Sequence, residues 1–412
     1  MLTVLRNSWA LLLGVMLLML GNGIQGTLLG IRGKMEGFSP LEMSAVMSAY
    51  YLGFLFGSRM APEMIRRVGH VRVFAALGSL VSAVLILYPV AVDWMAWSAM
   101  RVIVGFCFSG IYITAESWLN SSSTNETRGQ ALSAYMIMQM VGIIGAQALL
   151  NFRDPGGFDL FVISSILVSI AFTPILLSAG QAPPFERTKP MPIRRLFRAS
   201  PLGCVGMFLM GGVFAAQFGM ASVWGAEVGL SVKNLSIFVG AIYVGGLVLQ
   251  YPIGWASDRL DRRTLIMWLA AFGAAVTFSG MILSWTLPVL VAIAFLSGGV
   301  SNPIYSLLVA YVNDYLEGAE MAGASSGLLF INGLGAIGGP LLTGWFMGYF
   351  GPEGYFLFMS LLFCGIASYA LWRMTRRRAQ VFVRSRFRAL SPSASSVAVE
   401  ASIEDRASHP GE

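Results

Sequence analysis

Residues 254–263 read Gly-Trp-Ala-Ser-Asp-Arg-Leu-Asp-Arg-Arg and join two long apolar runs, residues 235–255 and 264–284. Half of the residues in this stretch are charged, whereas the two runs contain no charged residue. A short charged turn between runs of about 20 apolar residues is typical of the loop between two membrane-spanning helices. The stretch therefore predicts a pair of spanning helices.

The composition of the whole chain supports a membrane protein. Of its 412 residues, 56% are hydrophobic and only 11% are charged, and the mean hydropathy is +0.71. A soluble domain carries about 25% charged residues, so this chain cannot cover a water-facing surface with polar groups. The net charge of +7 could suit nucleic acid. The basic residues, however, occupy short turns and the C-terminal tail, and we expect no nucleic-acid partner.

Twelve stretches are long and apolar enough to span a bilayer as helices. They are too long for barrel strands and lack a two-residue alternation, so we expect an all-α integral membrane protein in a lipid bilayer. The expected spans are residues 9–29, 43–60, 73–92, 95–119, 130–150, 159–178, 201–224, 235–255, 264–284, 288–312, 323–347 and 354–372.

The positions of Lys and Arg predict the orientation. With the N-terminus inside the cell, 22 of the 27 basic residues fall on the cytoplasmic side, so both termini are expected in the cytoplasm. The first apolar run is too long for a signal-peptide core and no small-residue cleavage site follows it, so we expect it to stay as a spanning helix.

A change of composition at residues 179–200 divides the chain, because this stretch is rich in proline and arginine. We expect an N-terminal six-helix half at residues 1–180, a cytoplasmic linker at 181–200 and a C-terminal six-helix half at 201–378. Residues 379–412 lack a sustained apolar period and are expected to form a disordered cytoplasmic tail.

The turn at residues 254–263 resembles the signature between helices two and three of the major facilitator superfamily. The signature has a glycine, three residues, an aspartate, an arginine, then a glycine and a basic pair; here Asp261 replaces the second glycine. A weaker counterpart at residues 61–72 has Arg66 in place of the usual aspartate. Charges at such a turn can bridge neighbouring helix ends and hold one conformation closed. The residues expected to form this conformational latch are Asp258, Arg259, Arg262, Arg66, Arg67 and Gly69.

A second signature of the superfamily, an arginine followed after three residues by a glycine in helix four, matches Arg101 and Gly105. Further stretches are similar to the YcaD-like subgroup of bacterial members: residues 115–117, 128–129, 134–136 and 250–254. The resemblance covers about residues 5–375. It implies twelve helices in two six-helix halves with pseudo-two-fold symmetry, a monomer, and the bacterial inner (plasma) membrane.

Apart from Asp159 at the first position of its span, Glu116 is the only carboxylate within the expected spans, and an ionisable group there is a functional hypothesis by default. It shares one face of helix four with Arg101, about 22 Å away along the axis at 1.5 Å per residue, so the two cannot pair directly. We expect Glu116 to carry the coupling proton and Arg101 to attract an anionic group or to set the charge of the cavity. The alternative, a hydrogen bond from Glu116 that ties helix four to a neighbour, stays open.

Polar residues within the spans are the candidates for substrate binding, because a buried amide or hydroxyl must face protein or a wet cavity. The resemblance implies that helices one, four, seven and ten line that cavity. Helix–helix hydrogen bonding is the alternative role for each candidate. In helix ten we expect Pro303 to interrupt the helix. The candidates are Asn22, Gln25, Tyr112, Gln139, Gln217, Asn302 and Tyr305.

The sequence has neither a phosphate-binding loop nor a GxSxG motif, and its two histidines, His70 and His409, make a histidine metal site improbable. We therefore expect the protein to have no enzyme activity and to bind no cofactor or metal. The expected function is secondary active transport of a small organic solute by alternating access, coupled to protons. The glycine–proline signature of drug–proton antiporters is missing from helix five, which favours uptake by symport. Proton-driven export of drugs or metabolites, and a transporter-like assembly factor or sensor, remain the alternatives.

Overall fold

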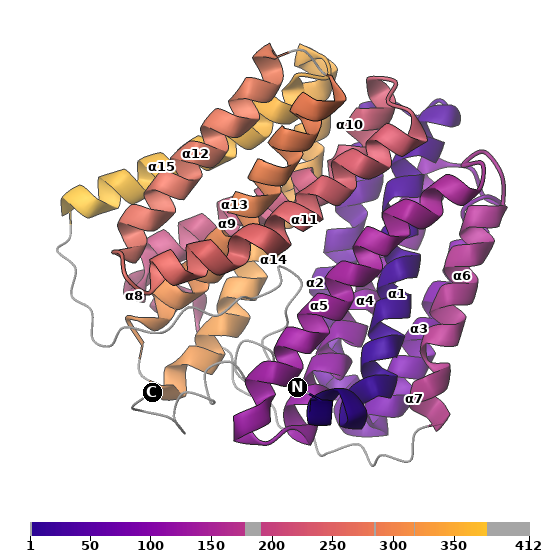
Figure 1. Cartoon of the computed structure of the whole chain (residues 1–412), viewed down its shortest axis with the longest axis horizontal. Coiled ribbons are helices and arrows are strands. Elements are labelled where there is room, and N and C mark those ends of the chain that lie inside the picture. Colours follow the sequence, from indigo (N-terminus) through magenta and orange to yellow (C-terminus); the bar gives the residue numbers. More distant parts are fainter. Residues whose placement is uncertain (1, 178–190, 284–285, 317, 377–412) are drawn as a thin grey trace. The chain divides into compact units, whose positions relative to one another are not determined.

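A computed structural model describes residues 2–177, 191–283, 286–316 and 318–376, which are helical throughout apart from the connecting turns (Figure 1). The expected tail and half of the expected linker lie outside these residues. Unit by unit, the helices are α1 (Leu2–Met35), α2 (Pro40–Val68), α3 (His70–Leu87), α4 (Trp94–Ser122), α5 (Asn125–Leu149), η1 (Leu150–Phe152), α6 (Asp159–Ala171), α7 (Thr173–Leu177), α8 (Ile193–Ala199), α9 (Pro201–Phe214), η2 (Ala215–Met220), α10 (Ala221–Glu227), α11 (Val232–Ser257), α12 (Arg262–Ile282), α13 (Leu287–Asn313), α14 (Gly318–Phe350) and α15 (Gly354–Arg376).

A helix, or a series of joined helices, occupies most of each of the twelve predicted spans. In the described part of the chain, 11 helical segments are long and apolar enough to cross a membrane. The remaining predicted span lies in α2, which contains three serines and two tyrosines and has a charged C-terminal segment. Many large apolar side chains are exposed, including Trp268 at 65% and Ile282 at 70%. Lipid is the solvent that such a surface requires, so the expectation of an all-α membrane fold is confirmed.

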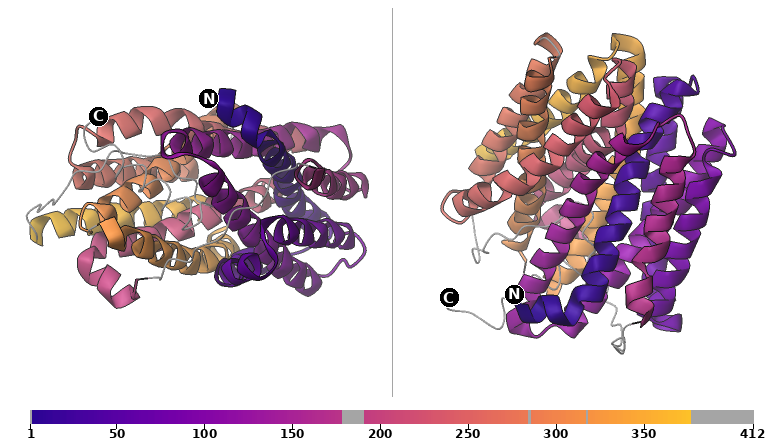
Figure 2. Two further views of the ribbon diagram at one scale, coloured as in Figure 1. Left: turned by 90° about the horizontal axis from the view of Figure 1, so that it is seen from below. Right: turned by 45° about the vertical axis from the view of Figure 1, so that its right-hand side comes forward.

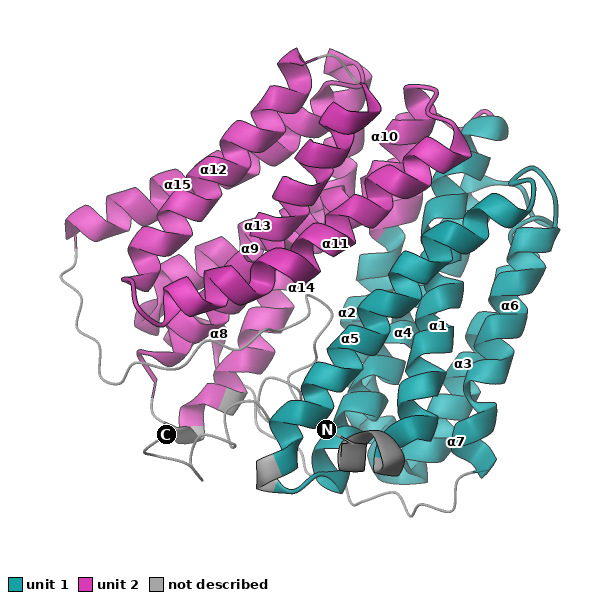
Figure 3. Cartoon of the chain, viewed as in Figure 1, with its two compact units in different colours: residues 1–36, 49–189, 393–412 teal, residues 37–48, 190–392 magenta. Residues whose placement is uncertain are grey.

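The helices group into two compact units (Figure 3). Unit 1 holds α1, α2 from residue 49 onward, and α3 to α7; unit 2 holds residues 37–48 and α8 to α15. Within unit 1, α1 packs along α5 and α6, and α3 packs against α4 (Figure 2). Within unit 2, the corresponding pairs are α9 with α14, α9 with α15, and α12 with α13; α11 also packs along α13, and α12 along α15.

Glycine lets α2 and α4 of unit 1 pack with their backbones in contact. A Cβ atom on Gly53 would lie 1.9 Å from the carbonyl oxygen of Val102, and one on Gly105 would lie 1.9 Å from that of Tyr50. No side chain fits at such distances, so these glycines set the separation of the two helices. The glycine of the helix-four signature is thereby explained: it brings Tyr50 against the turn of α4 that carries Arg101.

The same contact recurs between α11 and α13 of unit 2. A Cβ atom on Gly245 would lie 1.9 Å from the oxygen of Phe295, and one on Gly298 would lie 2.1 Å from that of Ile242. The spacing is the same in both units. In unit 1, Gly53 follows Tyr50 by three residues and Gly105 follows Val102 by three. In unit 2, Gly245 follows Ile242 by three residues and Gly298 follows Phe295 by three. The two halves are therefore tandem repeats with matching positions.

Two helices depart from regular α geometry where the sequence predicted plain spans. The seventh span contains a π-helical turn, η2, between α9 and α10, and the sixth is divided at Phe172 into α6 and α7. The expected interruption at Pro303 is wrong, because α13 runs unbroken from Leu287 to Asn313. A proline removes one backbone bond, and the well-packed neighbours of this helix hold its remaining turns in place.

Candidate substrate and coupling site

Arg101 is the cation within α4, and its side chain is only 5% exposed. Its Nη1 donates to the Oε1 atom of Gln25 in α1 at 3.0 Å. Its guanidinium carbon lies 4.6 Å from the centre of the Tyr50 ring in α2, a cation–π distance. Three helices of unit 1 thus hold the guanidinium in one place.

The groups beside this guanidinium form a buried polar cluster. Gln25 uses its oxygen to accept from Arg101. The hydroxyl of Tyr88, which follows α3, contacts the side-chain amide of Gln25. Both side chains are almost fully buried. An indole hydrogen bond from Trp97 to the Tyr88 carbonyl, 3.0 Å long, fixes the Tyr88 backbone.

Glu116, predicted to carry the proton, is fully buried in α4. The Tyr135 phenol of α5 lies close to its carboxyl group. The next residue, Ser117, contacts the buried His70 ring through an Oγ–Nε2 distance of 2.9 Å. Both expected roles, proton carrier and helix tie, are compatible with this enclosed position.

In unit 2 the polar cluster is neutral. Gln217 lies in the π-helical turn η2, donates through Nε2 to Ser297 at 3.1 Å, and accepts from the Ser301 hydroxyl at 2.9 Å. Both ends of the amide are therefore satisfied by α13. A π-helical turn is often found at functional sites, and here it directs the glutamine toward α13.

The repeat places Gln25 and Gln217 at matching positions. A Cβ atom on Gly142 of α5 would meet the oxygen of Met16, and one on Gly335 of α14 would meet that of Phe208. Gln25 follows Met16 by nine residues, and Gln217 follows Phe208 by nine. The glycine contacts of α4 and α13 match Arg101 with Ala294 and Tyr112 with Tyr305 by the same reasoning.

The other substrate-binding candidates have varied surroundings. Tyr112 donates to the Met19 sulfur at 3.5 Å, and Tyr305 packs edge-on against the Phe214 ring, 5.7 Å between centres. Asn302 fills the space left by Gly246, and its Oδ1 atom has no partner in the described part of the chain. The last two candidates are placed apart: Gln139 is buried, with no hydrogen-bond partner for its Nε2 atom among the described residues, and Asn22 is half-buried.

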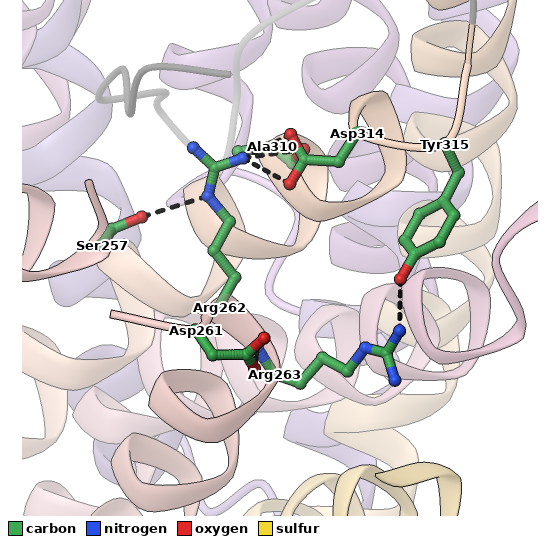
Figure 4. Close-up of polar contacts among 7 residues, drawn as sticks. All are labelled: Ser257, Asp261, Arg262, Arg263, Ala310, Asp314 and Tyr315. Carbon is green, nitrogen blue, oxygen red and sulfur yellow. Dashed lines mark hydrogen bonds and ion pairs between the residues drawn. The ribbon is translucent and has the colours of Figure 1, made fainter. Parts of the chain in front are cut away.

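The predicted latch of unit 2 contains a buried ion pair (Figure 4). Arg262 donates from Nη1 to both carboxylate oxygens of Asp314, each at 2.6 Å, and both side chains are about 5% exposed. Its Nε atom also donates to the Ser257 hydroxyl at 3.3 Å. The start of α12 is thereby bound to the end of α13.

Asp261 directly precedes α12 and caps it, which explains why an aspartate replaces the second glycine of the family signature. Its carboxylate accepts from the backbone nitrogens of Arg263 and Thr264, which caps the helix. Arg263 donates to the Tyr315 hydroxyl at 2.6 Å. The other predicted latch residues here are exposed: Asp258 lies in the turn, and Arg259 stacks on the Trp255 ring at 4.0 Å.

The counterpart in unit 1 is built differently, as its sequence suggests. Arg66 and Arg67 both pair with Glu63 at 2.7 Å on an exposed surface. These hydrogen bonds from Arg66 and Arg67 lower the pKa of Glu63 to about 2. Gly69 has a φ of 84°, a conformation that favours glycine, and it turns the chain from α2 into α3.

Several residues of these clusters were missed from sequence. Asp314 and Tyr315 lie just beyond the predicted end of helix ten, and Tyr50, Tyr88 and Tyr135 are aromatic residues among many apolar ones. Among the described residues no group of three or more His, Cys, Asp and Glu could hold a metal. No sequence signal marked the tyrosines, because Tyr50 reaches Arg101 and Tyr135 reaches Glu116 only in the folded chain.

Comparison with known proteins decides the family. The sequence model described as Major Facilitator Superfamily matches residues 11–242 and 202–402. The chain belongs to the major facilitator superfamily. It is a membrane transporter and not an enzyme.

The relatives and solved structures agree with this assignment. The chain is 25% identical over 370 residues to an uncharacterized MFS-type transporter of Enterobacter sp. strain 638, with 89% of this chain and 93% of the relative covered. It is 23% identical over 357 residues to YcaD of Escherichia fergusonii, covering 86% and 92%. The resemblance to the YcaD-like proteins is thus confirmed as a distant homology.

Among solved structures, the nucleoside transporter NupG matches with a TM-score of 0.76 at 14% identity, covering 90% of this chain and 99% of NupG. A bacterial homologue of the human lysosomal transporter Spinster matches with a TM-score of 0.67 at 14% identity, covering 96% and 97%. At this identity the likeness establishes the shared fold.

Proposed function

We propose that this transporter moves a small organic solute across the bacterial inner membrane by alternating access of its two halves, and that a proton gradient drives it. Both termini lie in the cytoplasm in this proposal, as the distribution of basic residues predicts. The observation that carries proton coupling is the complete burial of Glu116 within α4. Burial favours the protonated form of a carboxyl group, so a change in its surroundings can release and take up a proton.

The role of Glu116 depends on its neighbours. The Tyr135 phenol close to the carboxyl group provides a polar contact that can differ between conformations. Arg101, farther along α4, contributes positive charge to the same half. Uptake by proton symport is favoured because helix five lacks the glycine–proline signature of drug–proton antiporters; proton-driven export is the second candidate.

The polar clusters of the two units are the proposed substrate contacts, with Gln25 in unit 1 and Gln217, Asn302 and Tyr305 in unit 2. The buried pair between Arg262 and Asp314 is the proposed latch, because breaking it exposes two charges and separates α12 from α13. The proposed assembly is a monomer. NupG transports nucleosides, but its low identity to this chain lends no substrate.

The test is transport in inside-out and right-side-out vesicles against a metabolite library, with and without an imposed proton gradient. Wild type, Glu116→Gln and the control Asp159→Asn, an exposed carboxylate of the same half that lies outside the predicted latch, are compared. Accumulation should follow the gradient in wild type and the control, and Glu116→Gln should bind the solute without accumulating it. Transport by Glu116→Gln with unchanged pH dependence would contradict proton coupling through this residue.

A transporter-like assembly factor or sensor is the remaining alternative. If no solute moves in either vesicle orientation while the folded protein binds a protein partner, the assembly-factor or sensor hypothesis replaces the transport proposal. The direction of accumulation in the two vesicle types separates uptake from export.

A further inference from the structure

Two arginines at the end of α15 are held against an exposed tryptophan. The guanidinium carbons of Arg373 and Arg376 lie 5.8 and 6.0 Å from the centre of the Trp372 ring, at cation–π distances. Neither arginine has a carboxylate within ion-pair distance among the described residues, and α15 itself contains no acidic residue. An aromatic ring therefore positions both cations, and no carboxylate in the described part of the chain neutralises them.

Arg263 brings a third cation to the same end of unit 2. α12 packs along α15 and against α13 (Figure 1). The guanidinium of Arg263, at the start of α12, lies 5.8 Å from the centre of the Tyr311 ring of α13, and Arg373 of α15 lies close to the same phenol. Two acidic residues nearby are engaged elsewhere, because Asp261 caps α12 and Asp314 pairs within the latch. The ends of three helices thus place these cations around one tyrosine.

The internal repeat shows that tryptophan takes the place of a carboxylate at this end of unit 2. In unit 1, Arg67 pairs at 2.7 Å with Glu63, four residues before it. The glycine contacts of α2 and α11 match these two residues with Arg259 and Trp255. Arg259 stacks on the Trp255 ring at 4.0 Å instead. Unit 2 holds its exposed arginines with neutral rings, so their charge stays available to an anion from outside the chain.

The two helices that carry these arginines also expose an apolar surface. Its large side chains include Trp268, Phe272, Leu361 and Leu371. A tryptophan at the end of a span, such as Trp372, is typical of the boundary between hydrocarbon and head groups. Arginine at that boundary keeps its stem in the apolar layer and its charge among the head groups. The distribution of basic residues predicts that this end faces the cytoplasm, where the leaflet carries anionic lipid.

We propose that Arg263, Arg373 and Arg376 bind the phosphate head group of an anionic phospholipid whose acyl chains lie along α12 and α15. A guanidinium donates to phosphate through paired N–H groups in its plane, and it keeps this capacity while its face rests on an aromatic ring. A lipid matches both the cations and the apolar side chains, whereas a free phosphate ion matches the cations alone. Bound lipid joins the ends of two helices and stabilises unit 2. The site is separate from the proposed substrate and coupling residues.

The first experiment records the apparent Tm of the purified protein in a neutral detergent. The additions are phosphatidylglycerol, phosphatidylcholine with the same acyl chains, and inorganic phosphate. Phosphatidylglycerol should raise the apparent Tm most, because it alone combines a net negative head group with acyl chains. Equal effects of the two lipids would overturn the recognition of charge. An equal effect of inorganic phosphate would show a site for a soluble anion in place of the lipid site.

The second experiment repeats the lipid titration with variants. Arg373→Gln with Arg376→Gln should bind phosphatidylglycerol about 30-fold more weakly, and Arg376→Gln alone about 5-fold more weakly. The single variant changes an exposed side chain, so it keeps the test valid if the double variant is unstable. The matched control, Arg194→Gln with Arg198→Gln, removes the same charge from the exposed face of α8 in the same unit and should bind as wild type does. Undiminished binding in both α15 variants, or an equal loss in the α8 control, would refute the site.

Native mass spectrometry of the purified protein identifies the occupant directly. Wild type should retain an anionic phospholipid that Arg373→Gln with Arg376→Gln loses. Retention of that lipid by the double variant, or a bound protein in its place, would contradict the proposal.

Discussion

Removal of the Asp314 carboxylate should destabilise unit 2 strongly. In wild type, the guanidinium of Arg262 donates to both oxygens of this carboxylate at 2.6 Å, and both side chains are about 5% exposed. Asp314→Ala leaves a buried guanidinium without its carboxylate partner, while its hydrogen bonds to the Ser257 hydroxyl and the Ala310 carbonyl remain. The loss of one partner from a buried pair costs about 3–5 kcal/mol.

The assay is thermal unfolding of the purified protein followed by intrinsic fluorescence. A domain of this size loses about 2–4 °C of Tm per kcal/mol, so Asp314→Ala should lower the apparent Tm by about 6 °C or more. The double variant Arg262→Met with Asp314→Leu should recover most of that loss, because an apolar pair of similar volume costs little. The control Glu63→Ala removes an exposed partner and should change the apparent Tm little. An unchanged Tm in Asp314→Ala, or a double variant no better than the single one, would refute the reasoning.

Three further predictions follow from the local geometry. Gly105→Ala should cost about 1–3 kcal/mol, since its methyl group would lie 1.9 Å from a backbone oxygen, whereas Gly26→Ala meets no atom within 4 Å; equal apparent Tm values for the two would contradict this. Asp261→Ala should lower stability by about 1 kcal/mol through loss of the α12 cap, measured in the same assay, and Asp261→Asn should retain most of it. Because hydrogen bonds from Arg66 lower the pKa of Glu63 from 4.5 to about 2, its contribution is present above about pH 5 and is lost toward pH 2. The Tm difference between wild type and Glu63→Gln should therefore be constant from about pH 5 to 8, and a difference that grows as the pH falls would contradict it.

The helices were predictable from sequence because each span is a long apolar run with charged ends, and this pattern depends on local composition alone. The two-repeat organisation was predicted from the paired turn signatures, and the cytoplasmic linker stays a prediction. The π-helical turn η2 was not predictable, since it depends on how Gln217 meets Ser297 and Ser301 across the packed helices. The continuity of α13 through Pro303 likewise depends on its neighbours.

The site was predictable in part, and the reason differs from residue to residue. Arg101, Glu116 and Gln25 are conspicuous because charged and amide side chains are rare in apolar runs. Their partners were not evident: Tyr50 reaches Arg101 only because Gly53 and Gly105 bring two helices together. Pairing of this kind is a property of tertiary packing, which the order of residues along one helix does not contain.

The ion pair of the latch shows the same limit. Arg262 was identified from its turn, but its partner Asp314 lies 52 residues later, just past the end of a predicted span. The family signature specifies the residues of the turn but not the partner of Arg262. That partner is determined by the packing of α12 against α13.

The measurement that tests the central claim most directly is accumulation of a labelled solute by the purified protein in proteoliposomes under an imposed proton gradient. The account predicts that the internal concentration rises above the external one, that a protonophore abolishes the rise, and that Glu116→Gln exchanges solute without accumulating it. Equal internal and external concentrations with and without the gradient, in protein that binds the solute, would contradict proton-driven transport.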